Sequence, residues 1–405
     1  MKKKLLLFFL LITTISYSQI RIHGKVLSFD NSPLVGASVY LNNTTIGVST
    51  KNDGTFEFFT KEGIYELIVS YLGHKTVNYN LNTKTFNKPL RFKLEEDDMV
   101  LNEVVIRKTY YNEKWRSNLK VFKENFLGRT KLAKQANILN PKTLHFEYDI
   151  STETLTATAR EPLKIEHKGL GYLITFDLVH FSLDRYKLNY LGYTKFKNLT
   201  GSKRKQRRWK KNRLKAYLGS RMHFVRSLLN KTTTEEGFII HQFRREKNKE
   251  RPSDKEINTA RKLAKLYPIM NLNLSKKIQK PKTSLDSIIV VLQKSNYPKF
   301  KDYLYKKNVP PAGVIKTTSN KILLSFDNFL SVIYTKEKEE ENYVRGPFGR
   351  IRKPLKVQTS YIVLLAKDVE LDKTGEVINP LAIHYEGYWA FEQFADALPL
   401  NYQPK

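Results

Sequence analysis

The most constraining feature of this sequence is a run of short alternating segments between residues 20 and 95, separated by turn residues. Ala37, Val39 and Leu41 occupy every second position, which is the period of a strand with one buried face. The Asp53-Gly54 pair suits a tight hairpin turn, because glycine reaches positive φ without steric cost. The pattern predicts a small β-sandwich of seven strands, at residues 20–29, 37–42, 46–51, 55–60, 63–71, 75–80 and 90–95.

The same segment carries a spaced set of residues that points to a known module: Gly24, Pro33, Leu34, Gly36, Ala37, Val39, Gly47, Thr50, Gly54, Phe56, Ser70, Gly73 and Lys75. On these residues it resembles the carboxypeptidase regulatory-like domain, a transthyretin-like β-sandwich. In that family the domain accompanies many proteins and carries no peptidase centre, so the resemblance implies a module that binds or supports. The domain also forms N-terminal extensions of TonB-dependent outer-membrane receptors, which often end in a segment similar to residues 101–106 here, LNEVVI.

Receptors of that kind continue into a plug and a large barrel, and this chain departs from them. Its remaining residues lack the repeated alternating segments of ~10 residues that barrel strands show. We expect the sandwich over residues 19–98, a linker over 99–113 and a basic α+β domain over 114–405, with 247–282 as an inserted arm. The layout of the last region is similar to that of uncharacterised exported proteins carrying the same module, and this similarity implies no activity.

The first 18 residues have the pattern of an export signal. Lys2, Lys3 and Lys4 precede an apolar run over residues 5–12, and Ser16 and Ser18 provide small residues before a cleavage site at Gln19. The run is shorter than the ~20 residues that span a bilayer. We therefore expect an exported protein, periplasmic or associated with the outer membrane. The chain has no cysteine, which excludes disulfides and thiolate metal sites.

The charge of the chain is unevenly distributed. The formal net charge is +32, yet residues 19–98 hold equal numbers of basic and acidic side chains, so nearly all of the excess lies beyond residue 98. Such an excess attracts polyanions. For an exported protein these are lipopolysaccharide, anionic lipid surfaces and acidic glycans, whereas nucleic acid is less accessible. A basic surface that serves only solubility is the alternative.

The densest basic cluster lies on a stretch expected to be helical from about residue 205 to 229. Trp209, Ala216 and Tyr217 leave this helix one narrow apolar side. Arginine and lysine around the rest of its circumference suit phosphate or carboxylate groups, although a solvated helix face would look the same. The predicted polyanion-binding residues are Lys203, Arg204, Lys205, Arg207, Arg208, Lys210, Lys211 and Arg213.

Ser220 and His223 form a weak candidate for nucleophilic catalysis, because both would share one helix face. No Gly-x-Ser-x-Gly elbow surrounds the serine, and no acidic partner for the histidine can be identified. A simpler interpretation makes Ser220 the N-cap of a helix, with Arg221 and Arg226 on its surface.

Other segments complete the prediction for the basic region. The sequence from Ser253 to Glu256 indicates a capping box opening a short helix, and residues 287–292 are apolar enough for a buried strand. The scattered histidines show no metal-ligand spacing, and we expect no cofactor. The predicted function is a non-enzymatic binding or scaffold protein of the cell envelope that contacts an anionic glycan, lipopolysaccharide or a protein complex; a hydrolase with an unrecognised site is the alternative.

Overall fold

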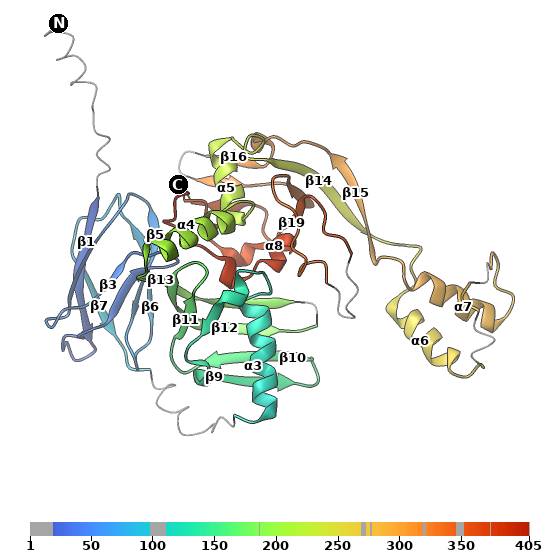
Figure 1. The fold of residues 1–405 in the computed structure, drawn as a ribbon, viewed down its shortest axis with the longest axis horizontal. Coiled ribbons are helices and arrows are strands. Elements are labelled where there is room, and N and C mark those ends of the chain that lie inside the picture. Colours follow the sequence, from blue (N-terminus) through green and yellow to red (C-terminus); the bar gives the residue numbers. More distant parts are fainter. Residues whose placement is uncertain are drawn as a thin grey trace, which may run out of the picture.

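The computed structural model describes residues 19–97, 111–185, 187–268, 273–275, 278–318, 321–345, 352–372 and 374–404. The predicted signal peptide, the LNEVVI segment and most of the predicted linker lie outside these residues. The described chain comprises an N-terminal β-sandwich and a larger mixed α+β region, with a two-stranded arm that extends away from both (Figure 1). The predicted fold class is confirmed.

The sandwich contains the seven predicted strands in two sheets. One sheet has the order β4-β1-β7 and the other the order β3-β2-β5-β6. Ile22, Val39 and Leu67 belong to the fully buried core between them. Gly54 has a φ of 77°, and a Cβ atom there would lie 2.6 Å from the Val26 carbonyl oxygen, so this turn requires glycine. The strands are β1 (Ile20–Ser28), β2 (Ser38–Leu41), β3 (Gly47–Ser49), β4 (Thr55–Thr60), β5 (Ile64–Ser70), β6 (Val77–Asn82) and β7 (Leu90–Leu94).

A six-stranded antiparallel sheet follows, covered on one face by α3 (Glu113–Phe126). Its long central strand, β12, pairs with β13 along one edge and with β11 and then β10 along the other. Phe122 and Phe126 lie one helical turn apart on α3 and are fully buried against this sheet. The strands are β8 (Ala136–Ile138), β9 (Leu144–Asp149), β10 (Thr154–Ala159), β11 (Leu163–His167), β12 (Tyr172–Leu183) and β13 (Leu188–Asn198).

A second core forms around a five-stranded sheet of order β15-β14-β18-β19-β21. Phe224, Val225 and Leu228 of α5 (Arg221–Asn230) pack into it. The strands are β14 (Phe238–Lys247), β15 (Phe300–Lys306), β18 (Phe329–Tyr334), β19 (Gln358–Leu364) and β21 (Ile383–Gly387). A small adjoining sheet contains β16 (Ile315–Thr317), β17 (Ile322–Leu324) and β20 (Val369–Leu371).

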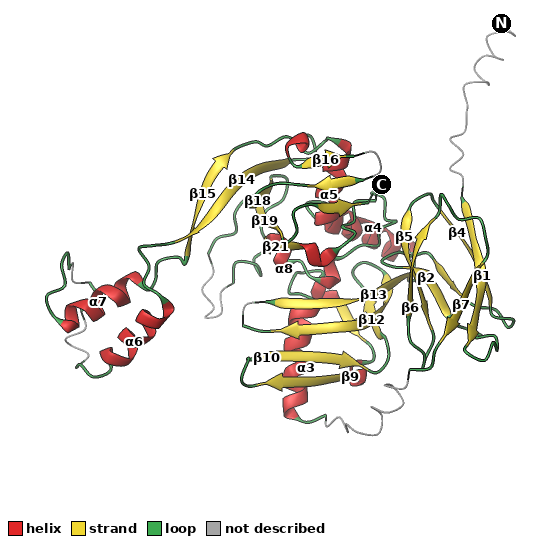
Figure 2. Cartoon of the chain, turned by 180° about the vertical axis from the view of Figure 1, so that it is seen from behind, coloured by secondary structure: helices red, strands yellow, loops and turns green. Residues whose placement is uncertain are grey.

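β14 and β15 continue beyond this sheet as a ribbon with two helices at its far end, α6 (Asp254–Ala264) and α7 (Ser284–Lys294) (Figure 2). The predicted capping box on Ser253 opens α6. The predicted strand at residues 287–292 is wrong, because this segment is part of α7. Thr283 and Asp286 form a second capping box there, and Ile288 and Ile289 are buried on a helical face.

The predicted helix over residues 205–229 is two helices, α4 (Lys203–Tyr217) and α5. The chain turns sharply between them, where Gly219 has a φ of 74° and Ser220 caps α5. A Cβ atom on Gly219 would lie 2.7 Å from the Tyr334 ring. Glycine is therefore needed both for the backbone conformation and for the close approach of the β18 strand.

The C-terminal segment connects the two cores of the mixed region. After β21, the helix α8 (Tyr388–Phe391) packs beside β19, and a 3₁₀ turn (Phe394–Asp396) enters the core under α3. The Phe394 ring stacks on Phe126 with centroids 4.7 Å apart and meets Phe176 edge-on at 4.8 Å. His167 Nε2 lies 2.9 Å from the Ala395 carbonyl oxygen, which fixes the same turn.

The sandwich is joined to the mixed region through its turn at residues 42–46. The backbone N–H of Asn43 donates to the Thr194 carbonyl oxygen at 2.8 Å, and the N–H of Phe196 donates to the Thr44 carbonyl oxygen at 2.9 Å. From the C-terminal tail, the N–H of Leu400 donates to the Asn43 carbonyl oxygen at 2.7 Å. This turn therefore binds β13 and the tail together.

We expect Phe394→Ala to lower the free energy of unfolding by about 3–5 kcal/mol, because the ring is buried between two other aromatic rings and its loss leaves a cavity. Urea unfolding followed by circular dichroism measures the change. Phe59→Ala is the matched control, since that ring is 51% exposed on β4. Equal losses in the two variants would contradict the anchoring role of Phe394.

Candidate functional site

Helix α4 presents most of the predicted polyanion-binding residues to solvent. Only Trp209, Ala216 and Tyr217 are buried, which are the three residues predicted for its apolar side. The exposed basic residues are Lys203, Arg204, Lys205, Arg207, Arg208, Lys210 and Lys211. Among the residues that the structure describes, none of these seven forms an ion pair with a carboxylate. Their charges therefore remain available to a partner.

Arg213 differs from the other predicted basic residues because it is committed to the fold. Its guanidinium lies 3.9 Å above the Tyr172 ring and donates to the carbonyl oxygens of Leu170 and Gly171. Trp209 Nε1 donates to the Lys168 carbonyl oxygen at 2.9 Å, and Arg208 donates to the same oxygen at 3.3 Å. These contacts fasten α4 to the turn between β11 and β12.

The placement of charge on α4 opposes helix stability. Lys203, Arg204 and Lys205 occupy the first turn, where the partial positive charge of the helix N-terminus disfavours cations. Arg204 and Arg208 are four residues apart, as are Arg207 and Lys211, and each like-charge pair costs about 0.2–0.5 kcal/mol. The basic face therefore does not stabilise the helix that carries it.

The structure does not bring the Ser220 hydroxyl to the ring of His223. Ser220 Oγ donates to the Tyr217 carbonyl oxygen and accepts from the backbone N–H of His223, so it acts as the N-cap of α5. The buried ring of His223 accepts from the Gly219 N–H at Nδ1, and its Nε2 lies 3.1 Å from Glu236. Burial lowers the pKa of His223. Both side chains therefore form hydrogen bonds that stabilise the corner between α4 and α5.

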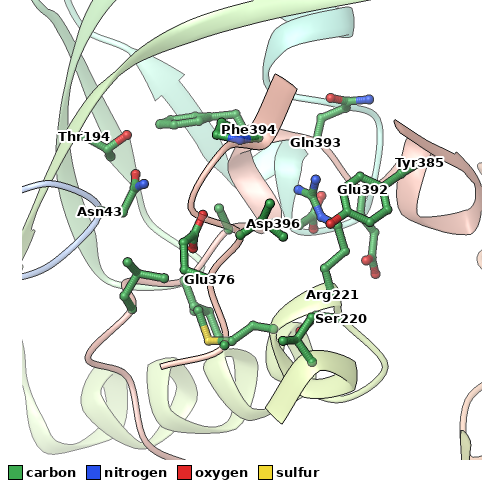
Figure 3. Close-up of a pocket in the computed structure, with 18 of the residues that line it drawn as sticks. Asn43, Thr194, Ser220, Arg221, Glu376, Tyr385, Glu392, Gln393, Phe394 and Asp396 are labelled. Atoms are coloured by element: carbon green, nitrogen blue, oxygen red, sulfur yellow. The ribbon is translucent and has the colours of Figure 1, made fainter. Parts of the chain in front are cut away.

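A pocket of about 280 Å³ lies beside that corner, where the sandwich turn, β13, α5 and the C-terminal segment meet (Figure 3). Apolar side chains form much of its wall. Arg221 extends into it from α5, towards Asp396 and Glu392, while Glu376 faces it from the opposite side. The sequence prediction missed this pocket, because its polar residues come from distant segments and Arg221 was expected on the surface. The apolar lining includes Phe176, Met222, Val377, Ile383, Phe394 and Leu398.

The three acids of the pocket are held in an environment that disfavours their charge. Burial raises the pKa of Glu376 to about 7, with a further contribution from the negative charge of Asp372. Burial likewise raises the pKa of Asp396 to about 7, and it raises the pKa of Glu392 well above its ordinary value. These carboxyl groups line the pocket and are half-buried, with protein around them on most sides. Among the described residues that line this pocket, Arg221 alone carries a positive charge.

A smaller cavity of about 190 Å³ shares Glu392 and Asp396 with the pocket and is also lined by Glu337 and Glu340. Despite this concentration of acids, no three His, Asp or Glu side chains in the described part of the chain are arranged to hold a metal ion. In the same residues, no helix is both long and apolar enough to cross a membrane.

Comparison with known proteins identifies one part of the chain. Residues 22–106 match the family model of the CarboxypepD_reg-like domain, in agreement with the resemblance found in the sequence. The match extends beyond the sandwich strands and includes the LNEVVI segment. It does not reach α4 or the pocket wall formed by the mixed region. A search of curated proteins gave no significant match.

We expect Glu376→Gln to stabilise the protein in a pH-dependent way. In the folded chain the pKa of Glu376 is about 7, against 4.5 when the group is unperturbed, so the wild type loses stability as the pH rises from about 4.5 to 7 and no further above that. Glutamine removes this loss. The free energy of unfolding of the variant should exceed that of the wild type by about 1–3 kcal/mol at pH 8 and by little at pH 4.5.

Urea unfolding at pH 4.5, 6 and 8 measures this difference. The control is Glu235→Gln, which alters an exposed carboxylate and should stay within about 0.5 kcal/mol of the wild type at each pH. A stability difference for Glu376→Gln that does not vary with pH would contradict the buried, uncompensated state of this carboxyl group.

Proposed function

We propose that this protein is an exported, non-enzymatic binding protein of the cell envelope, and that the exposed face of α4 binds an anionic polymer such as lipopolysaccharide or an acidic glycan. The observation that carries the proposal is the set of unpaired cations on α4, which cost the helix stability. An anionic ligand would relieve both the mutual repulsion and the unfavourable helix-terminal charge. Export is supported by the residues 1–18 pattern.

The anchoring of α4 supports binding rather than a merely soluble surface. The bonds of Trp209 and Arg213 hold the helix in one orientation, so its cations form a fixed array and not a set of independent charges. A fixed array loses less conformational entropy on binding. Arginine in such an array can form bidentate contacts with sulfate, phosphate or carboxylate groups.

A charge-reversal variant of α4 tests the site. We choose Lys203, Arg204, Arg207 and Lys211, each changed to Glu, because none of them bonds to the β11–β12 turn and acidic residues in the first turn favour the helix. The affinity of the mature chain for heparin, measured at low salt by titration calorimetry, should fall by about tenfold or more, and wild-type binding should weaken as salt rises.

The control is the matched reversal of Lys255, Lys262, Lys265 and Lys282 to Glu on the arm. These side chains are also exposed, and the substitutions change the net charge equally. Heparin affinity should fall by no more than about threefold. Loss of binding in the arm variant with retention in the α4 variant would place the site on the arm and refute the proposal for α4. Equal losses would show that only net charge matters.

A further inference from the structure

The pocket beside α5 contains acidic and basic groups that have no hydrogen-bond or ion-pair partner among the described residues. Among the described residues, no hydrogen bond or ion pair engages the guanidinium of Arg221, which lies 5.0 Å over the Tyr385 ring. The carboxyl groups of Glu376 and Glu392 equally lack a hydrogen bond from any described residue. Figure 3 shows Arg221 and Glu376 reaching into the same space from opposite walls. Charged groups that protein surrounds on most sides are normally paired, so these half-buried groups have bonding capacity left for a ligand.

Arg226, five residues further along α5, is an arginine with a structural role and differs from Arg221 in its bonding. Its three nitrogens donate to the carbonyl oxygens of Thr374, Leu400 and Tyr402 at 2.7–2.8 Å. It thereby ties the loop before Glu376 and the C-terminal tail to α5. Arg221 performs no such task, which leaves its five N–H donors for a molecule in the pocket.

The loop that carries Glu376 is built to hold it in position. The carboxylate of Asp372 accepts from the backbone N–H groups of Thr374 and Glu376, both at 2.8 Å, and from the Thr374 hydroxyl. Gly375 has a φ of 91° and lies against Arg226, where a Cβ atom would come within 2.8 Å of a side-chain carbon. Because its backbone is fixed on both sides, the Glu376 carboxyl group stays at the pocket wall.

We propose that this pocket binds a small molecule that carries both a carboxylate and ammonium groups, such as a basic amino acid. Arg221 would receive the carboxylate through two parallel N–H bonds. Glu376 and Glu392 would receive the ammonium groups, and the aliphatic and aromatic wall would cover the carbon chain. Three acids face one arginine, which favours a ligand with more positive than negative charge. The volume of about 280 Å³ restricts the ligand to a small one, near the lower limit of ~300 Å³ for small-molecule pockets.

Titration calorimetry of the mature chain with L-lysine tests the proposal. L-lysine should bind at one saturable site. Cadaverine, which lacks the carboxylate, and hexanoate, which lacks the ammonium groups, should each bind about tenfold more weakly or worse, because each leaves one side of the pocket unpaired. Glucose, which has no charge, should not compete.

Two substitutions assign the two ends of the ligand. Arg221→Gln should lower the affinity for L-lysine at least about tenfold and leave the affinity for cadaverine nearly unchanged. Glu376→Gln should lower the affinity for both ligands. Arg221→Lys keeps the positive charge and should lower the affinity for L-lysine less than Arg221→Gln does. This difference distinguishes the loss of ligand recognition from misfolding of the variant. The unfolding midpoint of each variant is measured alongside.

The charge-reversed α4 variant should bind L-lysine as the wild type does, so failure at one site is distinguishable from failure at the other. The proposal is overturned by the absence of saturable L-lysine binding up to about 10 mM, where even weak ligands with Kd values of ~1 mM are detected. It is equally overturned if glucose displaces L-lysine, or if Arg221→Gln and Glu376→Gln leave L-lysine affinity unchanged.

Discussion

The position of the sandwich depends chiefly on one short turn, residues 42–46, which several hydrogen bonds hold in the mixed region; Thr76 adds one side-chain bond to Asp177. Thr44 pairs with Lys195 as an additional bridge beside β13, and the side-chain oxygen of Asn42 accepts from the Thr194 N–H at 2.7 Å. Asn401 exchanges hydrogen bonds with Thr45 from the C-terminal tail. Each bond contributes only about 1 kcal/mol, but their directions fix the orientation of the two parts. Asn43 then forms part of the pocket wall, so the sandwich positions the site as well as the fold.

Local features of the fold could be predicted from the sequence, because each depends on residues close together in the chain. The strands of the sandwich follow from alternation and turn residues, and the buried side of α4 from the spacing of Trp209, Ala216 and Tyr217. The prediction of a strand at residues 287–292 was wrong for a local reason. A short apolar run fits the period of a strand and that of a helix equally well. The capping residues Thr283 and Asp286 are what indicate a helix here.

The pocket could not be predicted in the same way, because no local pattern connects its residues. Arg221 belongs to α5, Glu376 to a loop after β20, and Asp396 to the last 3₁₀ turn. In sequence each resembles an ordinary surface charge. The packing of the C-terminal segment under α3, fixed by Phe394, brings Asp396 to the pocket, and Arg226 ties the loop before Glu376 to α5. The one available signal was the Gly219-Ser220 pair, which ends α4 and aims α5 in a new direction.

Two parts of the described chain hold charge that the protein does not neutralise: the exposed face of α4, whose cations form no ion pair, and the pocket, where three acids face one arginine. Both arrangements reduce the stability of the free protein, and local rules broken without structural benefit are typical of binding sites. The α4 face and Arg221 of the pocket lie on consecutive helices, and hydrogen bonds hold the corner between these helices. Trp389 Nε1 donates to the Gly219 carbonyl oxygen at 2.8 Å, and the Gly219 N–H donates to His223. Since these bonds hold α4 and α5 at one angle, we expect a polyanion on α4 and a small molecule in the pocket to bind with additive free energies.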